Sequence, residues 1–391
     1  MRTSLDMPVT TKTNQPKAPV LSLILCSRND RYMGNSIWRL ETTLNYVAKR
    51  VHELGREADV EVLIADWGSE IQLKDVLHLT TAASKIVSFV RIPPEIARHL
   101  QKDSPFPEVL ALNAAARRAQ GEYIGRIDQD TLVGRRFLKT FFELYERRTQ
   151  LEVPLNSALL FSNLRMVPYR FAVQCPSLCT VERFIDCFGQ HLNIDLPHRR
   201  PFYEHGVGIW LLHRNLWNGS GGYDERMIYM NDMEINMIFR LMQRYRLVNL
   251  GKLVDCDFYH LEHYHPRVPR KSSTYRKVNP LSHKQPDVFH PNTEDWGLAN
   301  YCFKVEPCSV NPGIAEVHSL STSAADFIVF WPLVLFSGAQ MAFDSVLNSV
   351  FSAYLVWIHR GKVAWETVRR QPILSWPHLL QKRWIEGGPR E

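Results

Sequence analysis

The feature that most constrains the fold is a series of short apolar runs, each of which ends in a polar, turn-prone group. Residues 20–26 (VLSLILC) run into SRND, residues 60–65 (VEVLIA) into DWGS, and residues 123–127 into DQD. Continuous apolar runs of this length are typical of strands buried on both faces of a sheet. Residues 36–54 and 105–119 have the pattern of helices between such strands. Strands that alternate with helices predict an α/β fold.

The rest of the first 300 residues continues this pattern with one interruption. A further strand is expected at 86–92, and residues 206–214 are strand-like. Residues 232–245 predict a helix, and residues 247–259 predict one or two more strands. Between these parts, residues 155–205 are proline-rich and less periodic, so they predict a strand followed by a loop-rich insertion.

Composition narrows the class of partner and the compartment. The chain has 391 residues and a net charge of +7, which suits an anionic partner. Its basic residues are spread along the sequence, so we expect no compact nucleic-acid patch and no nucleic-acid partner. The seven cysteines form no CxxC pair and predict reduced, mostly buried thiols. Residues 1–19 are polar and lack an apolar core, so they predict a flexible leader and a cytoplasmic start.

The C-terminal segment, residues 301–391, differs from the rest of the chain. Residues 327–343 carry no charge, and residues 359–384 are basic and rich in tryptophan. The uncharged run would make a helix of about 26 Å, short of the ~30 Å apolar core of a bilayer. Two interpretations stay open for 327–384: association with an anionic membrane surface from the cytoplasmic side, or an oligomer interface.

Acidic residues at the strand ends indicate chemistry. In open α/β sheets, ligands bind at the carboxyl ends of the strands. Asp128 and Asp130 follow the strand at 123–127, and two carboxylates at this spacing can face one pocket if the chain turns there. Hard oxygen ligands of this kind suit Mg²⁺ or Mn²⁺ bridged to phosphates. A DxD triplet alone is more often a surface turn, so its position in the sheet carries the hypothesis.

Five segments resemble, in order and spacing, the family 2 glycosyltransferases of the GT-A fold: LSLILCSRND, VEVLIADWGSE, ALNAAARRAQGEYIGRIDQDTLVG, GGYDERMIYMNDMEINMIFR and YHLEHYH. The resemblance covers about residues 20–300. It implies a Rossmann-like mixed sheet flanked by helices, with a nucleotide-binding half at 20–135 and an acceptor half at 136–300. Such enzymes transfer a sugar with inversion from a nucleoside diphosphate donor, here a UDP-sugar, with the aid of Mn²⁺ or Mg²⁺. The acceptor is expected to be a glycan or a lipid-linked hydroxyl.

The resemblance also implies roles for particular residues on the donor side. Asp66 matches the carboxylate that reads the donor base, although an Asx turn explains the same residue. Asp128 is expected to contact the ribose or sugar and to join Asp130 at the metal. The residues expected to line the nucleotide pocket or to hold the diphosphate are Ser27, Arg28, Asn29, Asn113 and Arg117.

On the acceptor side the resemblance implies a general base. The family places an aspartate at the start of the helix after a GG-aromatic-DE turn, which is Asp232 here. A carboxylate at a helix N-terminus also compensates the helix dipole, so a structural role fits the same position. The usual Glu-Asp pair is Asn231-Asp232 in this chain, and one acidic acceptor contact is therefore missing. Tyr223, Asp224 and Glu234 are expected to contact the acceptor.

A histidine is expected to complete the metal site, as in related GT-A enzymes. His260, His263 and His265 are the candidates, because a neutral imidazole can join carboxylates around Mn²⁺. In an extended segment His263 and His265 share a face and His260 points the other way. We favour His263 and then His260. The competing hypothesis is a catalytically inactive glycan-binding or scaffolding protein on the same fold.

Overall fold

The structure is a computed structural model that describes residues 18–192, 194, 210–229, 233–263, 279 and 288–308. The chain divides into two compact units, Met1–Leu333 and Val334–Glu391, and all described residues belong to the first. Asp232, His265 and the segment 327–384 lie outside the described residues. The expectations for them therefore stay predictions.

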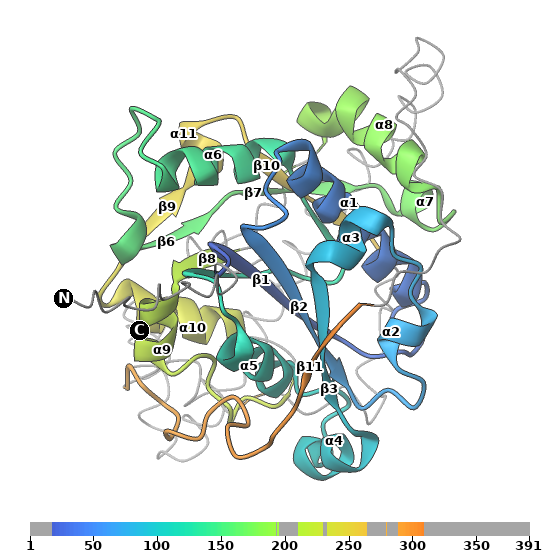
Figure 1. The fold of residues 1–391 in the computed structure, drawn as a ribbon, viewed down its shortest axis with the longest axis vertical. Coiled ribbons are helices and arrows are strands. Elements are labelled where there is room, and N and C mark those ends of the chain that lie inside the picture. Colours follow the sequence, from blue (N-terminus) through green and yellow to red (C-terminus); the bar gives the residue numbers. More distant parts are fainter. Residues whose placement is uncertain are drawn as a thin grey trace, which may run out of the picture. The chain divides into compact units, whose positions relative to one another are not determined.

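The described residues contain a sheet of eight strands in the order β11-β3-β2-β1-β4-β8-β6-β9 (Figure 1). The central four strands are parallel to one another: β3 (Val87–Ile92), β2 (Val60–Trp67), β1 (Leu21–Ser27) and β4 (Tyr123–Arg126). Antiparallel pairings flank them, between β3 and β11 (Val305–Pro307) and between β4 and β8 (Trp210–His213). The outer strands are β6 (Ala158–Phe161) and β9 (Arg246–Asn249). The prediction of a mixed α/β sheet is confirmed.

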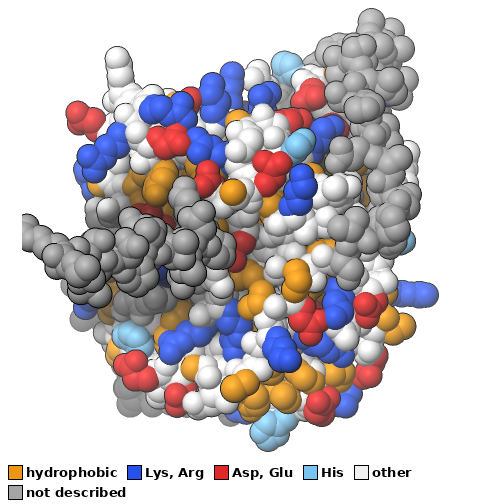
Figure 2. Space-filling model, in the orientation of Figure 1, with side chains coloured by type: hydrophobic (Ala, Val, Ile, Leu, Met, Phe, Trp, Pro, Cys, Tyr) orange, Lys and Arg blue, Asp and Glu red, His pale blue; other side chains and the backbone are white. Residues whose placement is uncertain are grey.

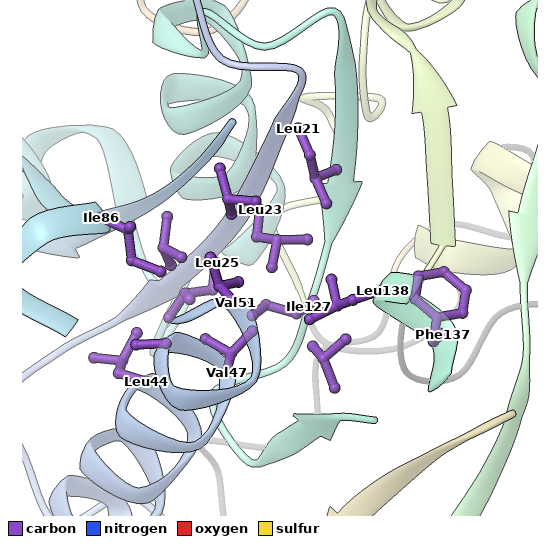
Figure 3. Packing of buried hydrophobic residues seen from close by; sticks show 14 of the residues in the cluster. Leu21, Leu23, Leu25, Leu44, Val47, Val51, Ile86, Ile127, Phe137 and Leu138 are labelled. Carbon is purple, nitrogen blue, oxygen red and sulfur yellow. The ribbon is translucent and has the colours of Figure 1, made fainter. Parts of the chain in front are cut away.

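Helices cover both faces of this sheet, because successive strand residues point to opposite sides. Leu23 and Leu25 of β1 pack in one apolar cluster, and Ile24 packs in the other. Figure 3 shows the first cluster, where side chains of β1 meet Leu44 and Val47. Helices of the first face are α1 (Ser36–Glu53), α3 (Thr81–Ile86) and α6 (Arg135–Tyr145), and those of the second are α5 (Glu108–Arg118), α9 (Arg214–Ser220) and α10 (Met233–Met242).

A small second sheet of three strands adjoins the DQD turn. Its order is β5 (Thr131–Val133), β10 (Asp257–Leu261) and β7 (Asn163–Val167). β5 begins directly after Asp130, and its antiparallel pairing with β10 places His260 opposite Thr131. This register brings two segments that are far apart in the sequence to the same place.

The prediction of a loop-rich insertion at 155–205 is wrong for its described part. That part contains β6, β7, α7 (Tyr169–Ala172) and α8 (Leu178–Phe188). The Oγ of Ser177 caps α8 by accepting the amide of Thr180 at 3.3 Å, and Phe184 of α8 stacks on Phe171. Further short elements are α2 (Leu73–Val76), α4 (Pro94–Gln101), α11 (Leu250–Leu253), η1 (Leu155–Ser157) and η2 (Gly189–His191).

The sheet also extends past the expected boundary of the domain at residue 300. β11 pairs with β3, and the amide of Cys308 donates to the carbonyl of Val87 at 3.1 Å. Residues 305–307 therefore belong to the same sheet as β1, β2 and β3, and Cys308 continues the contact with β3.

The structure tests the prediction that was made from the cysteines. All seven cysteines lie among the described residues and are reduced thiols, as expected, but only Cys256 is buried, so the prediction of mostly buried thiols is wrong. On the face shown in Figure 2, lysines and arginines are interspersed with aspartates and glutamates.

Among the described residues, none of the helices combines the length and the apolar character that a membrane span requires.

Candidate active site

The carboxyl ends of β1, β2 and β4 lie at one edge of the main sheet, because these strands are parallel. Ser27 is opposite Asp66 across β1 and β2, and Ile24 is opposite Arg126 across β1 and β4. The hydroxyl of Ser27 donates to Oε1 of Gln129 at 2.7 Å and ties the end of β1 to the DQD turn. The residues that come after these strands are therefore neighbours, as the strand-end argument expects.

Asp130 lies among three basic side chains. Nδ1 of His260 is 3.3 Å from Oδ1 of Asp130, and Nε2 of His263 is 3.3 Å from Oδ2. Nη1 of Arg39, which is fully buried on α1, donates to the same Oδ2 at 2.6 Å. The amide of Leu261 donates to the carbonyl of Asp130 at 2.8 Å, which fixes the end of β10 beside the turn.

The charge state of Asp130 depends on these neighbours. Burial alone would raise the pKa of Asp130, because a buried carboxylate loses hydration. His260, His263 and Arg39 together outweigh burial and hold the pKa of Asp130 below its usual range. Asp130 is therefore ionised at neutral pH.

The donor set fits a divalent metal ion. Ligand atoms of Asp130, His260 and His263 all lie within 4.8 Å of one another. One carboxylate with two imidazoles suits Mn²⁺, whereas Mg²⁺ favours a shell of oxygen ligands. Arg39 shares the carboxylate and adds positive charge, which weakens the binding of a free cation. Asp128, which was expected as a second metal ligand, is not in this group and lies in a neighbouring cluster.

That neighbouring cluster is built around Arg126, the last residue of β4. Its Nη2 lies 2.6 Å from Oδ1 of Asp128, 3.0 Å from Oε1 of Glu108 and 3.2 Å from Oε1 of Glu234. The Arg126 side chain is 3% exposed, whereas about a quarter to a third of each carboxylate side chain is exposed. Glu108 begins α5 and Glu234 lies in the first turn of α10. Three separate elements therefore meet at one guanidinium nitrogen.

The pKa values of two of these three carboxylates are raised above their usual range. Burial is the main cause for Glu108, whose pKa rises to about 8, and for Asp128, whose pKa rises to about 6. Neighbouring carboxylates add to both shifts, and Arg126 opposes them. The three carboxylates of the cluster thus outnumber the single positive charge of Arg126.

A pocket of about 280 Å³ opens beside the ends of β1 and β2. Arg28 and Asn29, both expected in the nucleotide pocket, line it. The amide of Asn29 donates to the Oγ of Ser69 at 2.8 Å, and Nε of Arg28 lies 2.8 Å from Asp30. Further lining residues are Trp67, Gly68, Glu70, Pro94, Ala97, Arg98 and Gln101.

Asp66 lies beside this pocket, and both oxygens of its carboxylate accept hydrogen bonds from neighbouring residues. The hydroxyl of Ser69 donates to one oxygen of Asp66, and the amide of Leu73 donates to the other at 3.0 Å. Arg91 is 3.7 Å away, and burial raises the pKa of Asp66. These are the contacts of a turn cap, and the role of Asp66 in reading a base stays a prediction.

Asn113 fastens a turn on the second face of the sheet. Its Nδ2 donates to the carbonyl of Tyr223 at 2.9 Å and to Glu225 at 3.0 Å, and its Oδ1 accepts the amide of Tyr223 at 2.8 Å. Tyr223 is fully buried, and Asp224 pairs with Arg226 at 2.7 Å. Asn113, Tyr223 and Asp224 therefore make structural contacts. The roles expected for them in binding the sugar donor or the acceptor substrate stay predictions.

Arg117 lies one helical turn beyond Asn113 on α5. Its guanidinium carbon lies 5.1 Å from the ring centre of Trp296, a cation–π contact. This contact directs the guanidinium to Trp296 on the second face of the sheet. The expected role of Arg117 near the diphosphate stays a prediction.

Arg39, Arg126 and Glu108 belong to the two clusters but were not expected from the sequence. Arg126 is the one basic residue in the buried strand β4, and Arg39 is fully buried on a helix that packs on the core. Charged residues in segments that must be buried call for a partner. This signal is present in the sequence, but it does not identify which carboxylate pairs with each arginine.

A larger cavity, of about 650 Å³, lies at the opposite end of β4. Glu122, Tyr123, Arg147 and Arg246 are among its lining residues. It is at the amino end of a central strand, whereas ligands of open α/β sheets bind at the carboxyl ends. We therefore assign the candidate active site to the smaller pocket and the neighbouring Asp130.

Comparison with known proteins finds likeness in structure but not in sequence. No family model matches the chain, and no curated protein matches it. The solved structures with some likeness include S. aureus TarS, with 13% identity, a TM-score of 0.40, and coverage of 62% of this chain and 36% of TarS. TarS 1-349 in complex with UDP has 15% identity and a TM-score of 0.39, with coverage of 62% and 60%. The complex with UDP-GlcNAc has 13% identity, a TM-score of 0.39, and coverage of 62% and 59%. The chain thus matches less than two thirds of the length of these proteins.

Proposed function

We propose that this protein is a metal-dependent glycosyltransferase that moves a sugar with inversion from a nucleoside diphosphate donor to an acceptor hydroxyl. One observation carries the proposal. Asp130, His260 and His263 come from distant segments and converge on one point at the carboxyl edge of the sheet. That point adjoins strands whose ends also line a pocket through Arg28 and Asn29. The resemblance to family 2 enzymes implies these same positions.

On the donor side, we assign the nucleoside to the pocket of Arg28 and Asn29 and the diphosphate to the Asp130 cluster. A divalent cation bound by Asp130, His260 and His263 would neutralise the charge that develops on the leaving diphosphate. Arg39 holds Asp130 in place from α1. Asp128, at the other end of the DQD triplet, is assigned to the sugar.

On the acceptor side, Asp232 is the proposed general base. The acceptor oxygen attacks the anomeric carbon as its proton passes to the carboxylate, and the bond to the diphosphate oxygen breaks on the opposite face. Glu234, two residues further on, lies in the Arg126 cluster with Asp128. The start of α10 is therefore beside the donor turn, which supports this assignment.

Hydrolysis of UDP-sugars, measured as UDP release with Mn²⁺ or with EDTA, tests the proposal. UDP and UDP-GlcNAc, the ligands in the TarS complexes, are the first to try. Release should depend on Mn²⁺ and be lost in Asp130→Asn. Asp255→Asn is the matched control, because Asp255 is 53% exposed and pairs with Arg136 at the surface. Equal release with EDTA, or none with any donor tried, would count against the proposal.

The second candidate function is a glycan-binding or scaffolding protein without catalysis. It is favoured by Asp66 and Asn113, whose side chains are already occupied by turn contacts. This candidate predicts binding of glycans with no release of UDP from any donor. The same release assay therefore separates the two.

We further propose that residues 327–384 bring the enzyme to a lipid-linked acceptor at an anionic membrane surface. The sequence of this segment supports this, since it combines an uncharged run with basic residues and tryptophans. Full-length protein should sediment with anionic liposomes at low salt and not with neutral ones. If it ignores both and forms larger particles by light scattering, the oligomer interpretation takes the place of this proposal.

A further inference from the structure

Arg126 is unusual for a residue of a central strand. β4 lies between β1 and β8, and its four residues are buried. A buried arginine costs free energy unless carboxylates or other acceptors surround it. Here the same nitrogen, Nη2, faces Asp128, Glu108 and Glu234 at 2.6, 3.0 and 3.2 Å. The fold thus holds one fixed charge where three separate elements meet.

The three partners belong to different parts of the proposed site. Asp128 is on the donor turn, and Glu108 opens helix α5. Glu234 is on α10, whose first described residue, Met233, directly follows the proposed base Asp232. Without a cation between them, the Asp128 and Glu234 carboxylates would repel each other and move apart.

We propose that Arg126 is a positioning residue that couples the donor turn to the acceptor helix, by holding Asp128 and Glu234 against one guanidinium nitrogen. It sets the distance between the group assigned to the sugar and the helix that carries the base. It need not touch either substrate. The inference rests on the proposed function for its catalytic consequence, but the coupling itself is a property of the described residues.

The geometry predicts an unusual pattern of substitution. Because all three carboxylates meet a single nitrogen, a lysine ammonium at this position can serve them, although arginine and lysine differ at sites that use the whole guanidinium fork. Arg126→Met keeps much of the volume but removes the charge. A packing role predicts that methionine is tolerated better than lysine, and a positioning role predicts the opposite.

The experiment compares Arg126→Met, Arg126→Lys and Arg50→Met in the full-length protein. Arg50 is the matched control, because it is a buried arginine of α1 that also pairs with two glutamates, Glu53 and Glu182. Three quantities are measured: UDP affinity with Mn²⁺, the rate of UDP-sugar hydrolysis, and amide hydrogen exchange over residues 237–241 of α10.

In Arg126→Met the hydrolysis rate should fall about 10- to 100-fold, since small misplacements of reacting groups have effects of this size. UDP affinity should stay within about threefold, because the nucleotide pocket lies on other strands. Exchange in α10 should become faster as its anchor is lost. Arg126→Lys should recover most of the rate and protection, and Arg50→Met should leave exchange in α10 unchanged.

Unchanged exchange in α10 in Arg126→Met, or methionine outperforming lysine, overturns the inference. Should Arg126→Met fail to fold, Glu234→Gln removes only the α10 partner and must speed exchange in α10 if the coupling is real. If wild-type protein neither binds UDP nor hydrolyses any UDP-sugar, the proposed function fails. The exchange measurement still decides on Arg126 in that case.

Discussion

The two charged clusters at the edge of the sheet are mirror images in composition. Around Asp130, one carboxylate faces three basic side chains, those of Arg39, His260 and His263. Around Arg126, one guanidinium faces three carboxylates. The two aspartates of the DQD turn are only two positions apart in sequence, yet each belongs to a different cluster.

The difference separates two tasks. The Asp130 cluster combines an ionised carboxylate with two imidazoles that offer lone pairs once they lose their protons, so it can accept a metal ion and, as we propose, a diphosphate through it. The Arg126 cluster already contains its own cation together with three carboxylates, so the role that we propose for it is to hold separate elements together. Substitutions in and around each cluster test whether the two clusters have these separate roles.

The largest effect is expected from the proposed base. Asp232→Asn should lower the rate of UDP-sugar hydrolysis by about 10²- to 10⁴-fold, since a general base contributes this much. UDP affinity with Mn²⁺ should hardly change, because the proposed nucleotide pocket is lined by residues at the ends of β1 and β2 and by residues of α4. A rate above about a third of wild type would place the base elsewhere, with Asp224, Glu225 and Glu234 next to examine.

Substitution of the two aspartates of the DQD turn should have large but unequal effects on UDP binding. Asp130→Asn should weaken Mn²⁺-dependent UDP binding by more than the ~10- to 100-fold typical of an outer-shell partner. Asp128→Asn should weaken it by less than about tenfold, because Asp128 faces Arg126. Titration calorimetry of both variants measures the contrast. Equal losses of UDP affinity in the two variants would indicate that both aspartates belong to a single metal site.

A smaller effect, in the opposite direction, is expected from Arg39. Arg39→Met removes a positive charge beside Asp130, so affinity for free Mn²⁺ should rise by about three- to tenfold. Electron paramagnetic resonance of free Mn²⁺ gives this affinity without nucleotide. Arg50→Met, on the same helix, is the control and should leave Mn²⁺ affinity as it is. An unchanged or lower affinity in Arg39→Met contradicts the arrangement at Asp130.

The smallest effect concerns stability. Folding raises the pKa of Glu108 to about 8, whereas an unfolded glutamate titrates near ~4.3. The unfolded chain therefore holds fewer protons between these values, and Glu108 makes the free energy of unfolding fall as pH rises through this window. Glu108→Gln should be more stable than wild type at pH ~8 by about 1 kcal/mol, allowing for partial exposure.

Urea unfolding at two pH values checks this prediction. The gain from Glu108→Gln should shrink towards pH ~4, where the native carboxyl and more than half of the unfolded population keep the proton. Glu70→Gln is the control, since Glu70 is 79% exposed in its pair with Arg98. A gain independent of pH would mean that charge is not the cause.

The fold is more predictable from the sequence than the partners within it. Apolar runs locate β1, β2, β3 and β4 because buried parallel strands need continuous apolar sequence. Helix α8 was not predicted, because its sequence, LCTVERFIDCF, contains β-branched residues and cysteines that are weak helix formers. Its cap at Ser177 and its packing on α1 stabilise it. Tertiary contacts of this kind are not visible in a local pattern.

The position of the candidate site in the sheet can be predicted from the sequence, but the contacts between its side chains are harder to predict. The strand-end rule identifies Asp128 and Asp130, and the resemblance identifies His260 and His263. The expectation that His260 and His263 face opposite sides is wrong, because β10 ends at Leu261, before His263, and the extended pattern does not continue to it. Both imidazoles consequently reach Asp130. Arg39 could not be assigned to Asp130, since the pair joins residues 91 apart in sequence.

Titration calorimetry of UDP into full-length protein, with Mn²⁺ and with EDTA, tests the proposed metal site itself. We propose that the cluster of Asp130, His260 and His263 binds a diphosphate only through a divalent cation. Without that cation, the ionised carboxylate of Asp130 and the negatively charged phosphates would repel each other. We expect UDP to bind with Mn²⁺ and its affinity to fall by about tenfold or more in EDTA. Equal UDP affinity in both conditions would contradict it.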